Sequence, residues 1–144
     1  MAADHTRELI DQLFELDSRV RRELRALCGD IELTDAQIGV LWRLSSQEGG
    51  LTSRQLADRL QCDPSTVTSL VDRLERNGIV QRQAHPRDRR AKLLLLTPLG
   101  CRLHTRLETY CRDESPFAGL TAEQRGVLHR LLSHVQNDHE PGRR

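Results

Sequence analysis

Residues 63–100, DPSTVTSLVDRLERNGIVQRQAHPRDRRAKLLLLTPLG, carry the clearest structural signals of the chain. On a helical wheel of residues 64–76 one stripe is apolar, and it consists of Val67, Leu70, Val71 and Leu74. Asn77-Gly78 ends this helix, and the chain then reads IVQRQ, a polar turn AHPRDRRA and KLLLL, within residues 79–96. We therefore expect an amphipathic helix followed by a β-hairpin with a long, charged tip.

The residues just before this helix predict a second, shorter one. Residues 52–61 place apolar side chains on one face, at Leu56, Ala57 and Leu60. The short turn Gln61-Cys62-Asp63 then leads into the next helix. Two short helices joined by so tight a turn are typical of a helix-turn-helix, and the hairpin behind them would be its wing.

Capping signals and apolar periodicity predict the remaining helices. A Thr followed three residues later by Gln forms a capping box at Thr34/Gln37, Thr52/Gln55 and Thr121/Gln124. Proline just inside a capping residue marks two more helix starts, at Asp63-Pro64 and Thr97-Pro98. Apolar spacings of three and four predict long helices over about 6–28, ended by Gly29, and over 98–114 and 122–138.

The expected fold class is mainly α with a small β-hairpin wing. We expect a single integrated domain over 1–144: an N-terminal dimerisation helix in 1–33, a winged helix-turn-helix region in 34–97, and C-terminal dimerisation helices in 98–144. A homodimer is expected because the apolar residues of the first and last helices exceed what one winged-helix core can cover.

Charge is balanced over the chain but not along it. The 144 residues carry 22 basic and 21 acidic side chains, which excludes a uniformly basic coat protein and an acidic tail. Residues 1–51 have 6 basic and 10 acidic side chains, whereas residues 52–92 have 9 and 5. This concentration of positive charge on the helix pair and hairpin is typical of a local phosphate-binding surface.

The sequence also predicts where the protein works. No apolar run reaches the length of about 20 residues that a membrane span needs, and the start, MAADHTREL, has no apolar signal-peptide segment. We expect a cytoplasmic protein with no membrane partner.

Candidate DNA-binding residues lie on the exposed side of the 64–76 helix and on the hairpin tip. Small hydroxyl side chains near a helix N-terminus let the backbone approach the major groove, where arginine also binds bases or phosphates. Tip arginines can reach an adjacent minor groove. The expected contacts are Ser65, Thr66, Thr68, Ser69, Arg73, Arg76, Arg87, Arg89 and Arg90.

The pattern VTSLVDRLERNGIV, the motif Asp88-Arg89-Arg90 and the closing LTPLG closely resemble the winged-helix core of the MarR family of bacterial transcription regulators. The order of elements extends the resemblance over nearly the whole chain. It implies a DNA-binding homodimer whose body is formed by the first and the last two helices. It also implies that a recognition-helix carboxylate pairs with a wing arginine, which fits Asp72 with Arg90, although Arg73 with Asp88 is a competing pair. Asp72 and Asp88 are therefore the candidate residues that anchor the wing.

Three kinds of signal sensing remain open. Cys62, at the start of the 64–76 helix, is placed for a thiol switch, but an inert thiol explains it as well. Zinc-type ligands share one helical face at Cys101, His104, Glu108 and Cys111, yet one ion could take only a subset, and a polar helix face explains them better, so we predict no metal site and no cofactor. Phe14 and Trp42 are candidates to line a small-molecule pocket, and core packing explains Trp42 equally well.

These observations predict a sequence-specific regulator that binds double-stranded DNA. We expect a repressor that a small-molecule, redox or metal signal relieves, acting on a pseudo-palindromic operator. No nucleophile-base set and no phosphate-binding glycine loop is present, so no catalytic activity is expected. The alternative is a helical adaptor of the same fold that works through protein contacts and binds no DNA.

Overall fold

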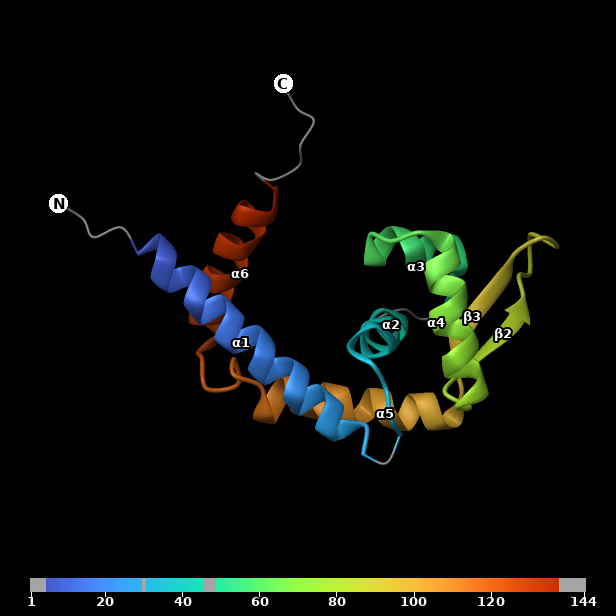
Figure 1. Ribbon diagram of the computed structural model, residues 1–144, viewed down its shortest axis with the longest axis horizontal. Helices are drawn as coiled ribbons and strands as arrows, with labels where there is room; N and C mark the ends of the chain where they lie inside the picture. The colour runs from blue at the N-terminus through green and yellow to red at the C-terminus, as the bar shows by residue number, and fades with distance from the viewer. Residues whose placement is uncertain (1–4, 30, 46–48, 138–144) are drawn as a thin grey trace, which may run out of the picture. The chain divides into compact units, whose positions relative to one another are not determined.

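The computed structural model describes residues 5–29, 31–45 and 49–137. Its elements, in chain order, are α1 (Thr6–Leu27), α2 (Asp35–Ser45), β1 (Leu51–Thr52), α3 (Ser53–Leu60), α4 (Pro64–Arg76), β2 (Val80–Ala84), β3 (Lys92–Leu96), α5 (Pro98–Thr109), a π-helical segment η1 (Tyr110–Glu114) and α6 (Ala122–Asn137) (Figure 1). The contacts divide the chain into two compact units, Met1–Thr109 and Tyr110–Arg144. In the part of the chain that is described, no helix combines the length and apolarity needed to cross a membrane.

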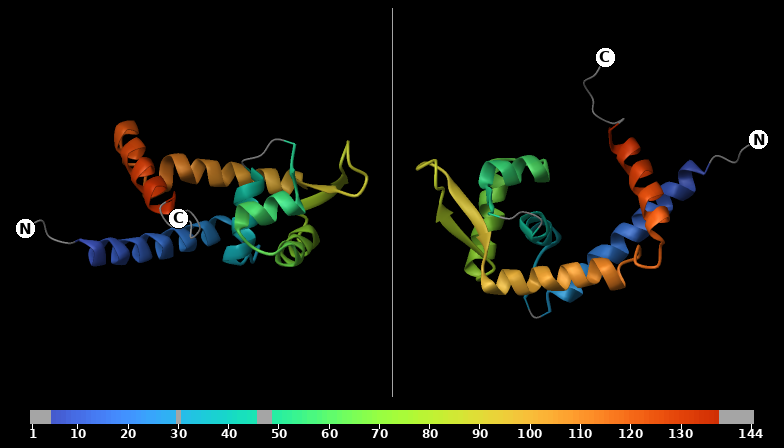
Figure 2. Two further views of the ribbon diagram at one scale, coloured as in Figure 1. Left: turned by 90° about the horizontal axis from the view of Figure 1, so that it is seen from above. Right: turned by 180° about the vertical axis from the view of Figure 1, so that it is seen from behind.

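The first unit holds the predicted winged helix-turn-helix. α3 ends at Gln61, which adopts the left-handed conformation (φ 52°), and the N–H of Cys62 donates to the carbonyl of Ala57 at 3.1 Å. Strands β2 and β3 pair antiparallel, and β1 adds to the other edge of β3, which gives the sheet order β1-β3-β2. The tip of the β2–β3 hairpin projects beyond the helices in both views of Figure 2.

The apolar stripe of α4 packs into the core as expected. Val67, Val71 and Leu74 are fully buried, and Leu70 packs at the edge of the same cluster. α2 packs against α3, α4 and α5, and α4 packs against β2. Because α2, α3 and β2 pack against the apolar side of α4, its polar side faces solvent.

The base of the hairpin is fastened to α5. The hydroxyl of Thr97 lies 2.5 Å from the carbonyl oxygen of Gly78 and accepts the N–H of Gly100 at 3.1 Å. A Cβ on Gly100 would lie 2.3 Å from the carbonyl oxygen of Ile79, so only glycine allows α5 to approach the end of the α4–β2 connection this closely. The wing therefore leaves the core from a fixed root.

Several local expectations are confirmed and others are corrected. All three predicted capping boxes form, with hydrogen bonds in both directions at Thr34/Gln37, Thr52/Gln55 and Thr121/Gln124. Asp63 caps α4 through its extended backbone, and its carboxylate makes no capping bond. The helix expected over 98–114 changes to π-helical geometry at Tyr110, and β1 was not expected. Residue 138, the expected end of the last helix, lies outside the described residues.

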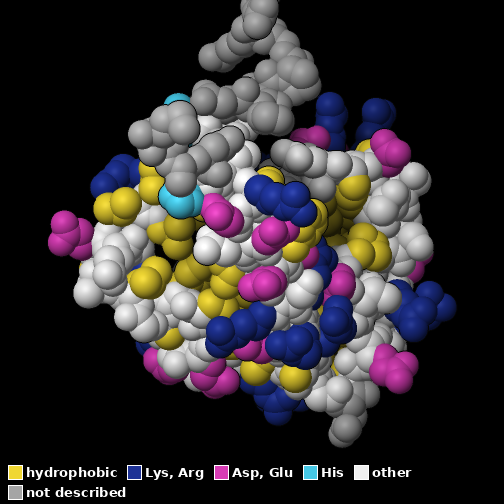
Figure 3. All heavy atoms as spheres, turned by 60° about the vertical axis from the view of Figure 1, so that its left-hand side comes forward, with side chains coloured by type: hydrophobic (Ala, Val, Ile, Leu, Met, Phe, Trp, Pro, Cys, Tyr) yellow, Lys and Arg dark blue, Asp and Glu magenta, His cyan; other side chains and the backbone are white. Residues whose placement is uncertain are grey.

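Both units expose apolar side chains. α1 buries none of its residues, and on it Leu9, Leu13 and Phe14 are 62%, 55% and 68% exposed. α6 likewise exposes Val127, Leu131, Leu132 and Val135. In Figure 3 hydrophobic side chains reach the surface among the charged ones. Exposed large apolar side chains gathered on a helix mark a surface that another molecule covers.

Candidate nucleic-acid interface

The polar face of α4 is open to solvent, as predicted. All six expected contact residues on this helix are exposed: Ser65, Thr66, Thr68, Ser69, Arg73 and Arg76. The Thr68 hydroxyl donates to the carbonyl of Pro64 at 3.0 Å, which leaves its oxygen lone pairs free to accept. The first two turns of α4 therefore present short hydroxyl side chains, and the guanidinium groups follow one turn later.

Two carboxylates on the same helix are neutralised by one arginine of the wing. Arg82 on β2 places its Nη2 2.6 Å from the Oδ1 of Asp72, and its Nη1 binds the carboxylate of Glu75. The hydrogen bond that Arg82 donates to Asp72 and the negative charge of both acids hold the pKa of Arg82 above its ordinary value. One guanidinium thus compensates the charge of both helix acids.

The expected Asp72–Arg90 pair is wrong, and the competing Arg73–Asp88 pair does not form either; all four residues are described. Arg82 takes Asp72 because β2 packs directly against α4, whereas Arg90 lies at the hairpin tip, beyond the end of the paired strands. Asp88 instead accepts the backbone N–H of Arg90 at 2.9 Å. Asp88 therefore shapes the tip locally.

His85 organises the same tip, and sequence reasoning missed it. Its side-chain Nδ1 accepts the backbone N–H groups of Arg87 and Asp88, both at 3.1 Å, and the backbone N–H of His85 donates to the carbonyl of Ala91 at 3.2 Å. These bonds close the turn that carries the tip arginines. The signal in the sequence was a side chain with an acceptor atom directly before Pro86, at the start of the polar turn. Such side chains commonly hold turns by accepting nearby backbone N–H groups.

The tip arginines and Arg73 carry unneutralised positive charge. Within the described ranges, the guanidinium groups of Arg73, Arg87, Arg89 and Arg90 form no ion pair, and all four residues are exposed. By contrast, the acids of α4 are paired with Arg82, and arginines of α1 pair with acids at Asp17, Glu23 and Asp35. The surface formed by α4 and the wing tip thus carries exposed positive charge suited to anions such as DNA phosphates.

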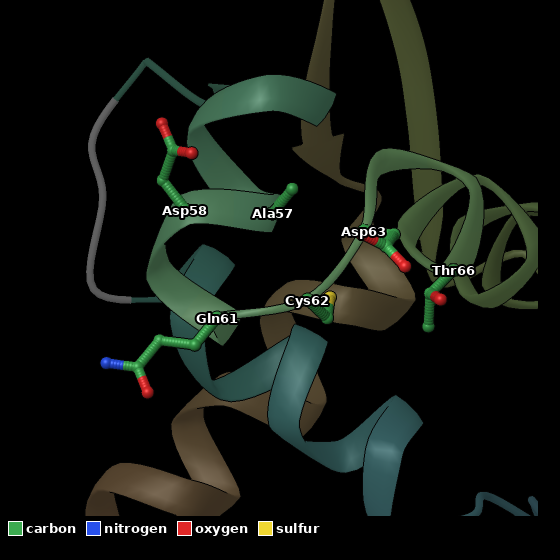
Figure 4. A pocket seen from close by; sticks show the side chains of 6 residues that line it. All are labelled: Ala57, Asp58, Gln61, Cys62, Asp63 and Thr66. Atoms are coloured by element: carbon green, nitrogen blue, oxygen red, sulfur yellow. The ribbon is translucent and has the colours of Figure 1, made fainter. Parts of the chain in front are cut away.

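Two open hollows flank α4. One, of about 530 Å³, lies at the turn between the helices and is lined by Ala57, Asp58, Gln61, Cys62, Asp63 and Thr66 (Figure 4). The other, of about 450 Å³, is lined by Ile31, Glu32, Arg73 and Asn77. Cys62 is half-buried and lines the first hollow, and Arg73 lines the second from the C-terminal half of α4.

The candidate sensing residues are dispersed. Phe14 lies on α1 and Trp42 on α2, and neither lines the two hollows above. Among the described residues, no three His, Cys, Asp or Glu side chains lie close enough together to hold a metal ion. Nε2 of His104 lies 3.1 Å from Oε1 of Glu108, and Cys101 is exposed. Burial raises the pKa of the Cys28 thiol, which is 4% exposed at the end of α1.

Known proteins match both the sequence and the geometry. The family model described as MarR family matches residues 33–92. The transcriptional repressor Rv2887 of Mycobacterium tuberculosis is 30% identical over 128 residues, covering 88% of this chain and 91% of that repressor. The chain belongs to the MarR family. The resemblance read from the sequence is thereby confirmed.

Solved structures of the MarR family agree with the fold. PcaV of Streptomyces coelicolor, crystallised with its natural ligand, is 31% identical, with a TM-score of 0.65 over 97% of this chain and 100% of that one. The reduced form of MarR from E. coli is 26% identical, with a TM-score of 0.68 over 88% of this chain and 95% of that one. The chain is therefore a winged helix-turn-helix transcriptional regulator, and the adaptor alternative finds no support among these relatives.

Proposed function

We propose that this chain is a homodimeric repressor that binds double-stranded DNA in a sequence-specific way and catalyses no reaction. α4 would enter the major groove, and the hairpin tip would reach the adjacent minor groove. The observation that carries this proposal is the charge pattern: the acids of α4 are paired with Arg82, while Arg73, Arg87, Arg89 and Arg90 are exposed without an ion pair among the described residues.

The residues of this surface divide into two roles. The hydroxyl groups in the N-terminal half of α4 and the guanidinium of Arg73 are suited to base edges, because a helix in the major groove reads bases with its first turns. Arg76 and the tip residues Arg87, Arg89 and Arg90 are suited to phosphates and to the narrow minor groove. Asp88 and His85 would keep the tip in shape.

The dimer is supported by the apolar faces of α1 and α6, considered one helix at a time. On α1, Leu9, Ile10 and Leu13 are 62%, 48% and 55% exposed, and α6 exposes Leu131 at 59% and Val135 at 64%. A second copy of the chain would cover these faces, with residues 1–33 and 98–144 as the dimer body and 34–97 as the DNA-binding region. Two recognition helices related by a two-fold axis require a pseudo-palindromic operator with half-sites about 34 Å apart.

A small-molecule signal would relieve repression. The relative PcaV was crystallised with a natural ligand, which supports ligand control within the family. In this chain the exposed aromatic side chains Phe14 and Trp42 would take part in such a pocket, because hydrophobic and aromatic side chains form most of the lining of small-molecule sites.

A gel-shift experiment tests the DNA-binding proposal. The probe is the promoter DNA upstream of the chain's own gene, and the control is a duplex of the same length and composition in scrambled order. We expect a shift of the promoter at protein concentrations at which the scrambled duplex stays free, with weaker binding at higher salt. No shift of either duplex, even at low salt, would overturn the proposal and favour a protein-binding adaptor.

A further inference from the structure

Arg82 differs from the other arginines of the wing because it faces inward. It pairs with Leu94 across the β2–β3 ladder, and residues directly opposite one another in an antiparallel pair point to the same face of the sheet. Leu94 is completely buried, so Arg82 shares the core-facing side, and its side chain is only 26% exposed. On the same strand, the neighbouring Gln81 and Gln83 are exposed.

The guanidinium of Arg82 bridges two acids that are three residues apart on α4. Residues at this spacing lie on one face of a helix, and the planar fork of arginine can bind two carboxylates at once. Asp72 and Glu75 are themselves 50% and 41% exposed, so their uncompensated charges would be felt at the surface that faces DNA. They also flank Arg73, the proposed base-reading residue.

The bridge also joins the two elements that would contact DNA. α4 would carry the base readout and β2 leads to the wing tip, so a contact between them fixes the tip relative to the recognition helix. Among the described residues, Arg82 is the wing side chain with an ion pair to α4. Removing it would unmask two negative charges and loosen the root of the wing together.

We propose that Arg82 is a positioning residue for DNA recognition: without contacting DNA, it neutralises Asp72 and Glu75 and holds the wing against α4. The inference rests on the proposed function. This role can be distinguished from a phosphate contact by mutation, because a neutralising arginine becomes dispensable once the acids it neutralises are removed.

A mutant cycle tests this role. The affinity for a fluorescently labelled promoter duplex is measured by anisotropy for the wild type, R82A, D72N/E75Q and R82A/D72N/E75Q. We expect R82A to bind about tenfold more weakly, and the two acid substitutions to strengthen binding at least fivefold more in the R82A background than in the wild type, since contacting groups are energetically coupled. The matched control is the same cycle with R87A, whose side chain has no acid partner among the described residues, and it should be additive.

The outcomes separate the two proposals. If the wild type binds and the Arg82 cycle is as additive as the Arg87 cycle, Arg82 acts independently of the acids and this inference is wrong while the DNA-binding function stands. If the wild type binds no duplex, the proposed function fails and the role of Arg82 fails with it. Circular dichroism checks the fold, and R82Q, which keeps most of the side-chain volume, replaces R82A in the cycle if that variant unfolds.

Discussion

Arg73 is the residue on which base-specific reading would most depend. It is the longest donor on the reading face of α4, it forms no ion pair with a described residue, and an arginine can bind guanine with two hydrogen bonds. We expect R73A to lose about 1 to 3 kcal/mol of binding free energy and to relax the preference at one base pair in each half-site. Selection of binding sites from a randomised operator library measures both effects.

A uniform loss would contradict this role for Arg73. If R73A weakens binding to every sequence equally, the side chain is a phosphate clamp and the hydroxyl groups of α4 carry the base readout alone. R76A is the matched comparison. Arg76 lies three residues after Arg73 on the same helix, and its Nε already donates a hydrogen bond to the backbone carbonyl of Asp72 at 3.3 Å. R76A should weaken all sequences by a similar factor.

His85 holds the backbone of the wing tip through its imidazole. H85A removes the acceptor for two N–H groups, so the amide hydrogens of Arg87 and Asp88 should exchange faster, by about 1 kcal/mol of lost protection, and DNA binding should weaken because the tip is no longer pre-organised. H85N places an amide oxygen where Nδ1 lies and should restore both. Hydrogen exchange followed by NMR gives the amide rates. Equal exchange in all three proteins would show that the imidazole does not hold the tip.

Sequence reasoning found the surface residues but missed the contacts between elements. The exposed face of α4 follows from helical periodicity alone, so the residues on that face could be named in advance. The partner of Asp72 could not, because its choice depends on which strand packs against α4 and on which side of that strand Arg82 points. His85 was missed for a related reason: its acceptor role needs the geometry of the closed turn.

The close packing of α5 against the root of the hairpin depends on Gly100. G100A should lower the free energy of unfolding by about 1 to 3 kcal/mol, because the new Cβ would lie 2.3 Å from a backbone carbonyl that cannot move aside. G126A is the matched control inside α6, where the nearest atom to a Cβ is 3.7 Å away, the end of the Arg130 side chain. It should gain up to about 1 kcal/mol from helix propensity. Urea unfolding measures both, and a G100A protein as stable as the wild type would contradict the close approach.

The wing tip is the element that should set the salt dependence of binding. Each lost phosphate contact makes the negative slope of log affinity against log salt concentration less steep by about 0.9. If Arg87 and Arg90 each bind a phosphate, the double variant R87A/R90A should bind more weakly, and the magnitude of its slope should decrease by about two. Titrations at several salt concentrations give the slope. An unchanged affinity and slope in a folded double variant would show that the tip is a solvated loop.

The regular elements were easier to predict than the short ones. Capping boxes and apolar spacings placed the starts of α2, α3 and α6 close to where the structure has them, because these signals are local. β1 has only two residues and exists through its pairing with β3, which no local pattern shows. The π-helical geometry of η1 was equally hidden, since its residues continue the periodicity of α5.

Two-fold symmetry would link the apolar helix faces of the whole molecule to the DNA sequence that it binds. An isolated chain would leave the apolar faces of α1 and α6 in water, and a second copy related by a two-fold axis would cover them and place two copies of α4 on one side of a duplex. Such a dimer cannot read an arbitrary sequence, since both half-sites must present the same base edges to identical helices. We therefore expect the operator to repeat the two-fold symmetry of the proposed dimer.

Hydroxyl-radical footprinting of the promoter upstream of the chain's own gene tests whether two recognition helices bind a symmetric operator. We expect two protected blocks related by a dyad, centred about one helical turn or roughly 34 Å apart, with flanking minor-groove protection that is lost in R87A/R90A. A single asymmetric block, or no protection at concentrations that saturate the gel shift, would contradict it.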